Sequence, residues 1–479
     1  MSSDPPRADQ PTGLRCSATW FLDRLCAPAK NHPLTTGGDR MPQLPGRSLL
    51  RNRFVRRLSM LSGGFVAGQL LIVASSPILT RLFTPAEFGV YAVFTAITGI
   101  FGNVLSFKYE LAVPIARSDA DAAALLGLSV LSVIGTCLVT GPIAWLGRDW
   151  LAKATEMPEL SGILWSVPIT IVLLSVTESV SYWSVYRGTY RLNAVARMVQ
   201  SAGQSAIQVG LGLLGFTASG MVLGYALGYA VRLAYLLYSF VPADLRLIAR
   251  PGQSALLRAG RRHWRYAAFS TPAALLEACT GLLPAIFIAM LFGPALAGMY
   301  GLGQRLMGLP VRLFSQAARQ VFLGEAAQRS PAGLFRLFRH SSILFLALGL
   351  VGMAPILLAG PQLFALLFGE AWRSAGSLVQ LLVPVYLTRF VVTPVSQTLN
   401  IVGRQNLHLI SASLDTTLML ATFGTAWLLD LAPMTTVLLF CLGSTTAYLV
   451  YYGLAWRVVQ VRARSASADG RASVRQPVG

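Results

Sequence analysis

Residues 81–117 read RLFTPAEFGVYAVFTAITGIFGNVLSFKYELAVPIAR, a polar turn followed by an apolar segment and a charged end. Part of this stretch recurs, because residues 82–91 (LFTPAEFGVY) align without gaps on residues 291–300 (LFGPALAGMY) with six identities in ten positions. Such self-similarity is typical of an internal duplication. Pro85 and Pro294 suit the first turn of a helix, and Gly89 and Gly298 would let that helix approach a neighbour closely. We interpret the two copies as the same hairpin in two halves of a duplicated protein.

The composition is that of an integral membrane protein. Of the 479 residues, 54% are hydrophobic and 12% are charged, and the mean hydropathy is +0.58. A soluble domain carries about 25% charged residues. The five cysteines have neither CxxC nor Cys/His spacing, so the sequence indicates no disulfide framework, metal site or cofactor.

Apolar stretches long enough to cross a bilayer occur twelve times, six on each side of a basic connection. The sequence therefore predicts an all-α membrane protein with about twelve transmembrane helices. The predicted spans are residues 58–80, 86–107, 122–146, 160–185, 198–216, 219–240, 266–292, 295–318, 341–358, 378–401, 407–429 and 435–456. The predicted domains are a first set of helices at 51–240, a basic cytoplasmic linker at 241–265, a second set at 266–458 and a cytoplasmic tail at 459–479.

The N-terminal residues 1–50 are polar, rich in proline and glycine, and without periodicity. We expect them to form a disordered cytoplasmic extension. Met41 is an alternative start, and deletion of residues 1–41 is expected to leave insertion and activity intact.

The net charge of +20 follows the topology of the spans. With the N terminus inside, 31 of the 39 Lys and Arg residues fall in the tails and inside loops, and four fall in outside loops. The positive-inside rule produces such a split. We therefore expect both termini to be cytoplasmic and the charge to reflect the membrane rather than a nucleic-acid partner.

The chain shows no catalytic signature of a soluble enzyme. Its four histidines lack ligand spacing, and Gly210, Gly212 and Gly215 match GxGxxG only inside an apolar span. No outside loop is long enough for the catalytic loops of a membrane glycosyltransferase, so an enzyme is disfavoured. Gly224 and Gly228 form a GxxxG motif, for which close helix packing and the ordinary glycine content of an apolar helix are both open.

Ionisable residues within the spans are the candidate site residues, because a charge at mid-bilayer costs about 2.5–3.5 kcal/mol. Arg305 and Arg312 lie seven residues apart and share one helix face. Together with Arg389, they could line a cationic cavity that binds an anion, since a guanidinium makes bidentate hydrogen bonds to phosphate. Internal ion pairing, for example with Glu277 or Glu178, is the alternative.

Other ionisable residues have open assignments. Arg232 could line the cavity or extend to the interface. Glu178, Glu277 and Asp415 are candidates for ion coupling or for ion pairs, and interfacial anchoring is the simpler assignment for Lys108 and Glu110.

Several stretches, in this order, resemble the polysaccharide transporter family, the O-antigen or capsule repeat-unit flippases of the MOP exporter superfamily. Residues 108–114 and 368–376 resemble its lipopolysaccharide biosynthesis branch most specifically. The resemblance covers residues 53–458. The matching stretches are RLFTPAEFGVYAVF, KYELAVPIAR, SYWSVYRGTYRLNAVARMVQS, GLGQRLMGLPVRLFSQAARQVF, LLFGEAWRSAGSLVQLLVP and LNIVGRQNLHL.

The resemblance implies two pseudo-symmetric bundles of six helices around a central cavity, a MATE-like fold. It further implies alternating access that carries an undecaprenyl-diphosphate-linked oligosaccharide across the bacterial cytoplasmic membrane. Only Arg305 is carried over from the family as a cavity residue. The partners would be this polyprenyl-linked oligosaccharide, the lipid bilayer, and the polysaccharide polymerase and chain-length machinery. A cation-coupled drug exporter of the same superfamily is the alternative, although its relatives often carry a carboxylate in the first span and residues 58–80 have none.

Overall fold

The computed structural model describes residues 63–249, 252–326, 330–396, 398–399 and 406–474. The predicted N-terminal extension and Met41 lie outside these residues. We call the helices between residues 63 and 239 the first half and those between residues 271 and 474 the second half.

Within these ranges the chain is helical and contains no strand. The first half begins with the helix Gly63–Leu82, whose last part is α3. The first-half elements are α3 (Ser76–Leu82), α4 (Pro85–Gly102), η1 (Tyr109–Ile115), α5 (Asp119–Ala154), α6 (Pro158–Ile163), α7 (Ser166–Tyr186), α8 (Tyr190–Leu213) and α9 (Ala218–Ser239). The remaining elements are α10 (Pro242–Ala249), α11 (Gln253–Arg265), η2 (Tyr266–Ser270), α12 (Thr271–Ala326), α13 (Pro331–Phe368), η3 (Glu370–Trp372), α14 (Arg373–Val395), α16 (Asn406–Leu428) and α17 (Pro433–Val474).

The helices account for the twelve predicted spans. In the described ranges, nine helical segments are long and apolar enough to cross a membrane by composition alone. Two further spans are α8 and α16, which carry polar residues, and the twelfth arises because α12 holds two spans joined at Gly293. Gly293 has a φ of 81°, a conformation that glycine adopts without a steric penalty.

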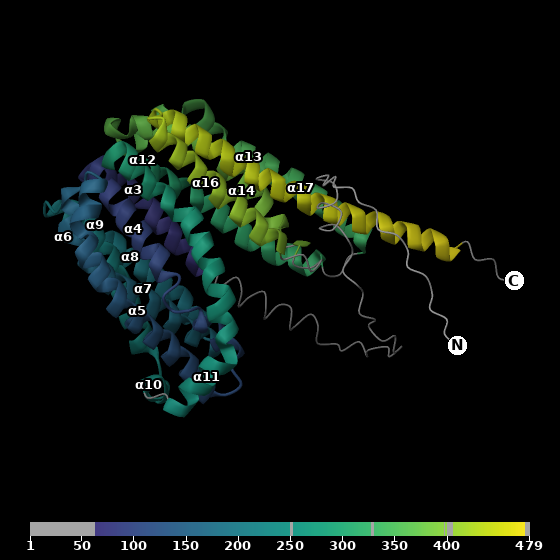
Figure 1. Cartoon of the computed structure of the whole chain (residues 1–479), viewed down its shortest axis with the longest axis horizontal. Helices are drawn as coiled ribbons and strands as arrows, with labels where there is room; N and C mark the ends of the chain where they lie inside the picture. The colour runs from purple at the N-terminus through teal and green to yellow at the C-terminus, as the bar shows by residue number, and fades with distance from the viewer. Residues whose placement is uncertain (1–62, 250–251, 327–329, 397, 400–405, 475–479) are drawn as a thin grey trace, which may run out of the picture. The chain divides into compact units, whose positions relative to one another are not determined.

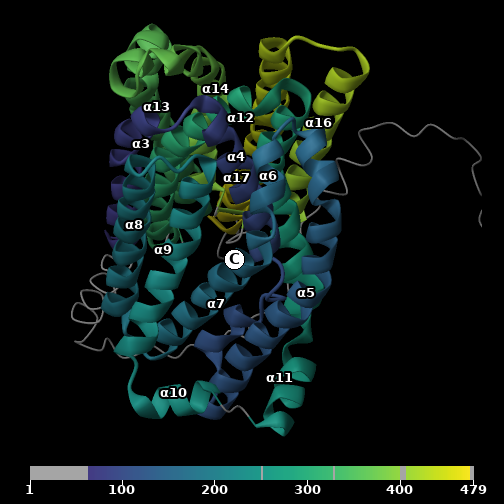
Figure 2. The ribbon, with the colours of Figure 1, turned by 90° about the vertical axis from the view of Figure 1, so that its left-hand side faces the viewer.

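Two segments outside the predicted spans are helical in the structure. The linker 241–265 forms the short helices α10 and α11, both of which pack against α5 (Figure 2). The last helix, α17, runs to Val474, well beyond the predicted end of the twelfth span at residue 456.

The duplicated hairpin brings the two halves into contact. The α4 helix starts at a capping box, in which the Glu87 backbone nitrogen donates to Thr84 Oγ1 and the Thr84 nitrogen donates to Glu87 Oε2. It packs along α12 (Figure 1). A Cβ atom on Gly89 would overlap the carbonyl group of Pro294.

The reciprocal contact comes from the second copy, because a Cβ atom on Gly298 would overlap the carbonyl group of Pro85. The predicted close approach of both glycines is therefore confirmed.

Trp372 of η3 joins the halves beside this crossing. Its side chain is fully buried, with its ring centroid 4.8 Å from that of Phe88 and its indole nitrogen donating to the Thr80 carbonyl oxygen at 3.1 Å. A buried tryptophan with a satisfied N–H contributes a large apolar contact area. The two halves are thus held together around the start of α4.

Within the first half, the GxxxG motif packs α9 closely against α8. A Cβ atom on Gly224 would collide with Gln208, and one on Gly228 would lie 2.8 Å from the Gln204 Cβ. Close helix packing is therefore the correct interpretation of Gly224 and Gly228. This contact fixes the side chains of both helices that face the interior.

Candidate functional site

A cavity of about 1580 Å³ lies between the two halves. Its walls come from the helix Gly63–Leu82 and from α4, α7, α8, α9, α12, α14, α16 and α17. All six candidate site residues border this cavity: Arg305, Arg312, Arg389, Glu178, Glu277 and Asp415. Their surroundings in the cavity differ.

Arg305 extends from α12 toward the first half. Its Nη2 donates to the Ile72 carbonyl oxygen at 2.8 Å, while its Nε and Nη1 are buried and have no hydrogen-bond partner among the described residues. The same carbonyl oxygen also accepts hydrogen bonds from the hydroxyl groups of Ser75 at 2.8 Å and Ser76 at 3.2 Å. A buried guanidinium with unsatisfied donors calls for an explanation, such as water or an anionic ligand.

Arg312 lies on the same face of α12 and is exposed to the cavity. Its Nε donates to the Gly308 carbonyl oxygen, one turn earlier, at 3.3 Å. Within the described ranges, neither Arg305 nor Arg312 forms a salt bridge with a carboxylate. The ion pairing with Glu277 or Glu178 that we considered as an alternative does not occur there.

Arg389 of α14 has a distant acidic partner. Its Nη2 lies 3.8 Å from Asp415 Oδ2, and its guanidinium carbon lies 5.1 Å from the ring centroid of Tyr448. Arg389 Nε and Asp415 Oδ1 are buried without hydrogen-bond partners in the described structure. Glu277 is exposed to the cavity. The second-half wall thus carries cations that its carboxylates neutralise only in part.

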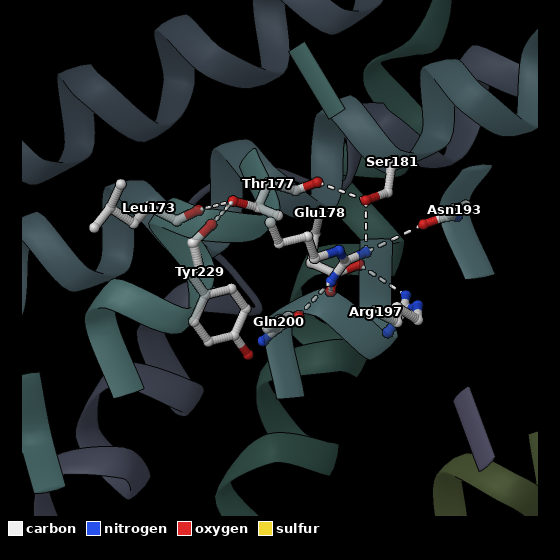
Figure 3. Close-up of polar contacts among 9 residues, drawn as sticks. Leu173, Thr177, Glu178, Ser181, Asn193, Arg197, Gln200 and Tyr229 are labelled. Atoms are coloured by element: carbon white, nitrogen blue, oxygen red, sulfur yellow. Dashed lines mark hydrogen bonds and ion pairs between the residues drawn. The ribbon is translucent and has the colours of Figure 1, made fainter. Parts of the chain in front are cut away.

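Glu178 of α7 is paired with two arginines (Figure 3). Its Oε1 accepts a hydrogen bond from Arg232 of α9 at 2.8 Å, and its Oε2 accepts one from Arg197 of α8 at 3.2 Å. Arg232 is fully buried, so the interfacial position we considered for it is wrong.

Polar side chains also surround Arg232, whose Nε has no hydrogen-bond partner among the described residues. Three of these side chains, Ser181, Asn193 and Gln200, are labelled in Figure 3. Arg232 Nη2 donates to Ser181 Oγ at 2.6 Å and to Asn193 Oδ1 at 3.3 Å, and Arg232 Nη1 donates to Gln200 Oε1 at 3.0 Å. A buried charge is tolerated when it is paired and hydrogen-bonded. This cluster joins α7, α8 and α9, which is a structural role.

The sequence suggested that Glu110 anchors the chain at the membrane interface, but the structure does not place it there. It is buried, with Ser106 donating to its Oε1 at 3.0 Å and Ser129 donating to its Oε2 at 3.3 Å. Lys108 borders the cavity, and its Nζ lies 3.9 Å from Glu110 Oε1. The short 3₁₀ helix η1 turns Glu110 inward, and residue type and span position alone did not reveal this turn.

Uncharged polar residues of the first-half wall escaped the sequence analysis. Tyr91 of α4 accepts a hydrogen bond from Gln204 Nε2 of α8 at 3.3 Å. The rings of Tyr91 and Tyr225 pack edge to face with centroids 6.0 Å apart, and Tyr225 packs similarly on Tyr229 at 5.2 Å. The sequence did contain a signal for this wall. A glutamine recurs every four residues at Gln200, Gln204 and Gln208, which places three amides on one helix face.

Across the described residues, no group of three or more His, Cys, Asp or Glu side chains is arranged to hold a metal ion. The cavity combines arginines, hydroxyl groups and amides with the carboxylates described above. Such a set can bind an anion and a polar uncharged group together.

Comparison with solved structures shows which fold these helices form. A MATE-family multidrug transporter of the MOP superfamily in an inward-facing conformation aligns with a TM-score of 0.64 and 16% identity, over 83% of this chain and 96% of that one. The lipid II flippase MurJ in an inward closed conformation aligns with a TM-score of 0.65 and 10% identity, over 84% and 90%. A MATE transporter of Vibrio cholerae aligns with a TM-score of 0.56 and 14% identity, over 86% and 98%. The chain therefore has the MOP-superfamily fold, as predicted.

The family follows from the sequence match. A family model described as polysaccharide biosynthesis protein matches residues 78–376, more than half of the chain. A comparison with curated protein sequences gives no significant match. The chain belongs to the polysaccharide biosynthesis protein family and is a multi-pass membrane protein, which confirms the resemblance found in the sequence.

Proposed function

We propose that this protein is a flippase that moves undecaprenyl-diphosphate-linked oligosaccharide repeat units across the bacterial cytoplasmic membrane, for the synthesis of O-antigen, capsule or exopolysaccharide. The observation that carries the proposal is the pair Arg305 and Arg312, which face one large cavity without a carboxylate partner among the described residues. Membership in a polysaccharide biosynthesis family supports this substrate class. The MOP fold that the chain shares with a lipid II flippase supports the transport reaction.

The arginines would neutralise the diphosphate while it crosses the bilayer. Arg305 makes one hydrogen bond to a neutral carbonyl group, and a phosphate oxygen is a stronger acceptor because it is charged. The lipid tail would remain in the membrane between the two halves, so that only the phosphates and sugars need the cavity. Alternating access would then consist of rocking of the halves around this site.

The proposed orientation places both termini, the linker 241–265 and the tail 459–479 in the cytoplasm. The cavity would then open inward, because it borders residues 268–270 and 411–415 near the predicted cytoplasmic ends of their spans. The close crossing at Gly89 and Gly298 would seal the outer side.

Single cysteines at positions 258 and 149 test this orientation. A membrane-impermeant maleimide should label Asp149→Cys in intact cells and Arg258→Cys only after lysis. The reverse pattern would refute it.

The decisive experiment is complementation of a strain that lacks its repeat-unit flippase. Removing a charged hydrogen-bonding group costs about 1.5–3 kcal/mol, so Arg305→Ala should slow export roughly ten- to a hundredfold if the loss falls on the rate-limiting step. Arg305→Lys should be intermediate, because lysine keeps the charge and loses the planar fork. Export by Arg305→Ala/Arg312→Ala at the wild-type rate, with normal membrane abundance, would overturn the proposal.

A matched control comes from an arginine outside the cavity. Arg373 is about half exposed and bridges Glu370 on the same surface turn. Arg373→Ala should therefore export at the wild-type rate. A similar loss in Arg373→Ala would show that the assay reports any loss of arginine rather than loss of the site.

The second candidate is a cation-coupled exporter of small molecules. It is favoured by Glu277 and Asp415, which place carboxylates on the second-half wall, and by the MATE-like fold. In either case Glu277 and Asp415 are the proposed coupling residues, since Glu178 is held by two arginines. Efflux of a cationic dye that depends on Asp415, without complementation of polysaccharide export, would establish the second candidate.

A further inference from the structure

The cavity has two chemically different walls. On the second-half wall, Arg305, Arg312 and Arg389 are cations with no carboxylate or only a distant one within the described structure. On the first-half wall the cations are matched, since Arg197 bridges Glu178 and Lys108 lies beside Glu110. An anion entering the cavity is therefore attracted to one wall.

The first-half wall offers uncharged polar groups in an ordered array. Tyr225 and Tyr229 lie one turn apart on α9, and Gln204 of α8 donates to the Tyr91 hydroxyl group of α4. The close packing at Gly228 and Gln204 fixes α9 against α8, so these side chains keep their relative positions. All four side chains border the cavity.

These groups match the chemistry of a sugar. A tyrosine hydroxyl group and a glutamine amide each act as donor and acceptor, as sugar hydroxyl groups do, so they can exchange hydrogen bonds in both directions. The tyrosine rings provide flat apolar faces with a polar end, suited to the C–H face of a pyranose ring. Both groups are neutral, so a phosphate binds more strongly to the arginines than to them.

We propose that Tyr91, Gln204, Tyr225 and Tyr229 form a glycan subsite, so that the oligosaccharide lies against the first half while the diphosphate lies against the second half. This inference rests on the proposed function and adds the orientation of the substrate and the residues that select its sugar. The inference assigns glycan selection and diphosphate binding to different walls of the cavity. The first-half wall determines which glycan is accepted, and the second-half wall binds the diphosphate common to every such lipid.

The test compares two ligands on the full-length protein in nanodiscs. One probe is undecaprenyl diphosphate, which carries no sugar, and the other is a panel of undecaprenyl-diphosphate-linked oligosaccharides with neutral and acetamido sugars. The glycan contribution is the ratio of the two dissociation constants for the best panel member. Gln204→Leu/Tyr225→Phe removes an amide and a hydroxyl group with little change in volume.

The double variant should lower the glycan contribution about tenfold, since two neutral hydrogen bonds are lost, and leave the affinity for undecaprenyl diphosphate unchanged. Arg305→Ala should weaken both probes by the same factor. The control Gln380→Leu/Tyr238→Phe changes the same residue types away from the cavity, where Gln380 donates to Leu357 and Tyr238 is 92% exposed. It should match the wild type.

The outcomes separate the two levels of inference. A double variant that weakens both probes equally, or that keeps the wild-type ratio, overturns the glycan subsite while the flippase proposal stands. A wild-type protein that binds every glycolipid no better than undecaprenyl diphosphate also overturns the subsite. A wild-type protein that binds neither probe overturns the proposed function and the subsite with it.

Discussion

Glu178 and Asp415 are carboxylates of one cavity, one in each half, and their surroundings differ. Glu178 accepts hydrogen bonds from Arg232 and Arg197 at 2.8 and 3.2 Å, in a cluster that joins three helices. Asp415 lies 3.8 Å from Arg389, and one of its oxygens is buried without a partner in the described structure. The two halves therefore differ in how their cavity carboxylates are paired. The first-half charges join three helices, whereas the second-half arginines of the cavity have at most one distant carboxylate in the described structure.

The largest expected effect comes from breaking the first-half cluster. Arg232→Leu leaves Glu178 without its buried partner, and loss of one member of a buried pair costs about 3–5 kcal/mol. We expect a strong fall in membrane abundance and in the melting temperature in detergent. Glu178→Leu/Arg232→Leu should recover much of the loss, because both charges of the pair are then absent.

A surface pair provides the reference for this comparison. Arg373 and Glu370 form an exposed ion pair, so Arg373→Leu should leave the stability close to that of the wild type. If Arg232→Leu were as stable as Arg373→Leu, the first-half cluster would have no structural role and the contrast between the halves would fail.

A smaller effect on stability is expected at the crossing of the two hairpins, where both halves make the same kind of close contact. Gly89→Ala and Gly298→Ala each place a methyl group against a carbonyl group of the other copy, and such overpacking costs about 1–3 kcal/mol. The two variants should lower the melting temperature by similar amounts. Gly135→Ala is the matched control, since a Cβ atom there has open space within 4 Å. Melting temperatures of Gly89→Ala and Gly298→Ala equal to that of Gly135→Ala would exclude a close crossing.

The smallest effect concerns the second-half wall. Asp415→Asn removes the carboxylate whose Oδ2 lies 3.8 Å from Arg389 Nη2, a separation too long for a hydrogen bond. Binding of undecaprenyl diphosphate in nanodiscs should therefore strengthen several-fold, because the charge of Arg389 then has no neighbouring carboxylate in the described ranges. If Asp415 couples transport to an ion, export by the same variant should fall despite the tighter binding. Unchanged or weaker binding would mean that Arg389 is not part of the anion site.

Much of the fold could be predicted from the sequence, because hydropathy and the repeated hairpin reflect local physics. The twelve spans follow from apolar length, and the contact of Gly89 with Pro294 follows from small residues at matching positions of two copies. The candidate arginines were identifiable because a charge in an apolar span is costly wherever it lies.

The pairing of those charges could not be predicted. Arg232 lies 54 residues from Glu178, and their contact depends on how α7 and α9 pack, which periodicity does not encode. The tyrosines and glutamines were missed for another reason. Neutral residues carry no large penalty in a membrane helix, so Tyr91 and Gln204 were not recognised until the cavity placed them together.

The crossing of the duplicated hairpins has a consequence for how this chain can evolve. Each glycine meets the main chain of the other copy rather than a side chain. A side-chain clash can be relieved by a second substitution in the neighbour, but every residue type has the same carbonyl group. A substitution at Gly89 or Gly298 therefore cannot be compensated by a second substitution in the other copy, and both positions are expected to remain glycine. The cavity walls are free of this restriction, so the side chains that line the cavity can change while the frame that joins the halves stays fixed.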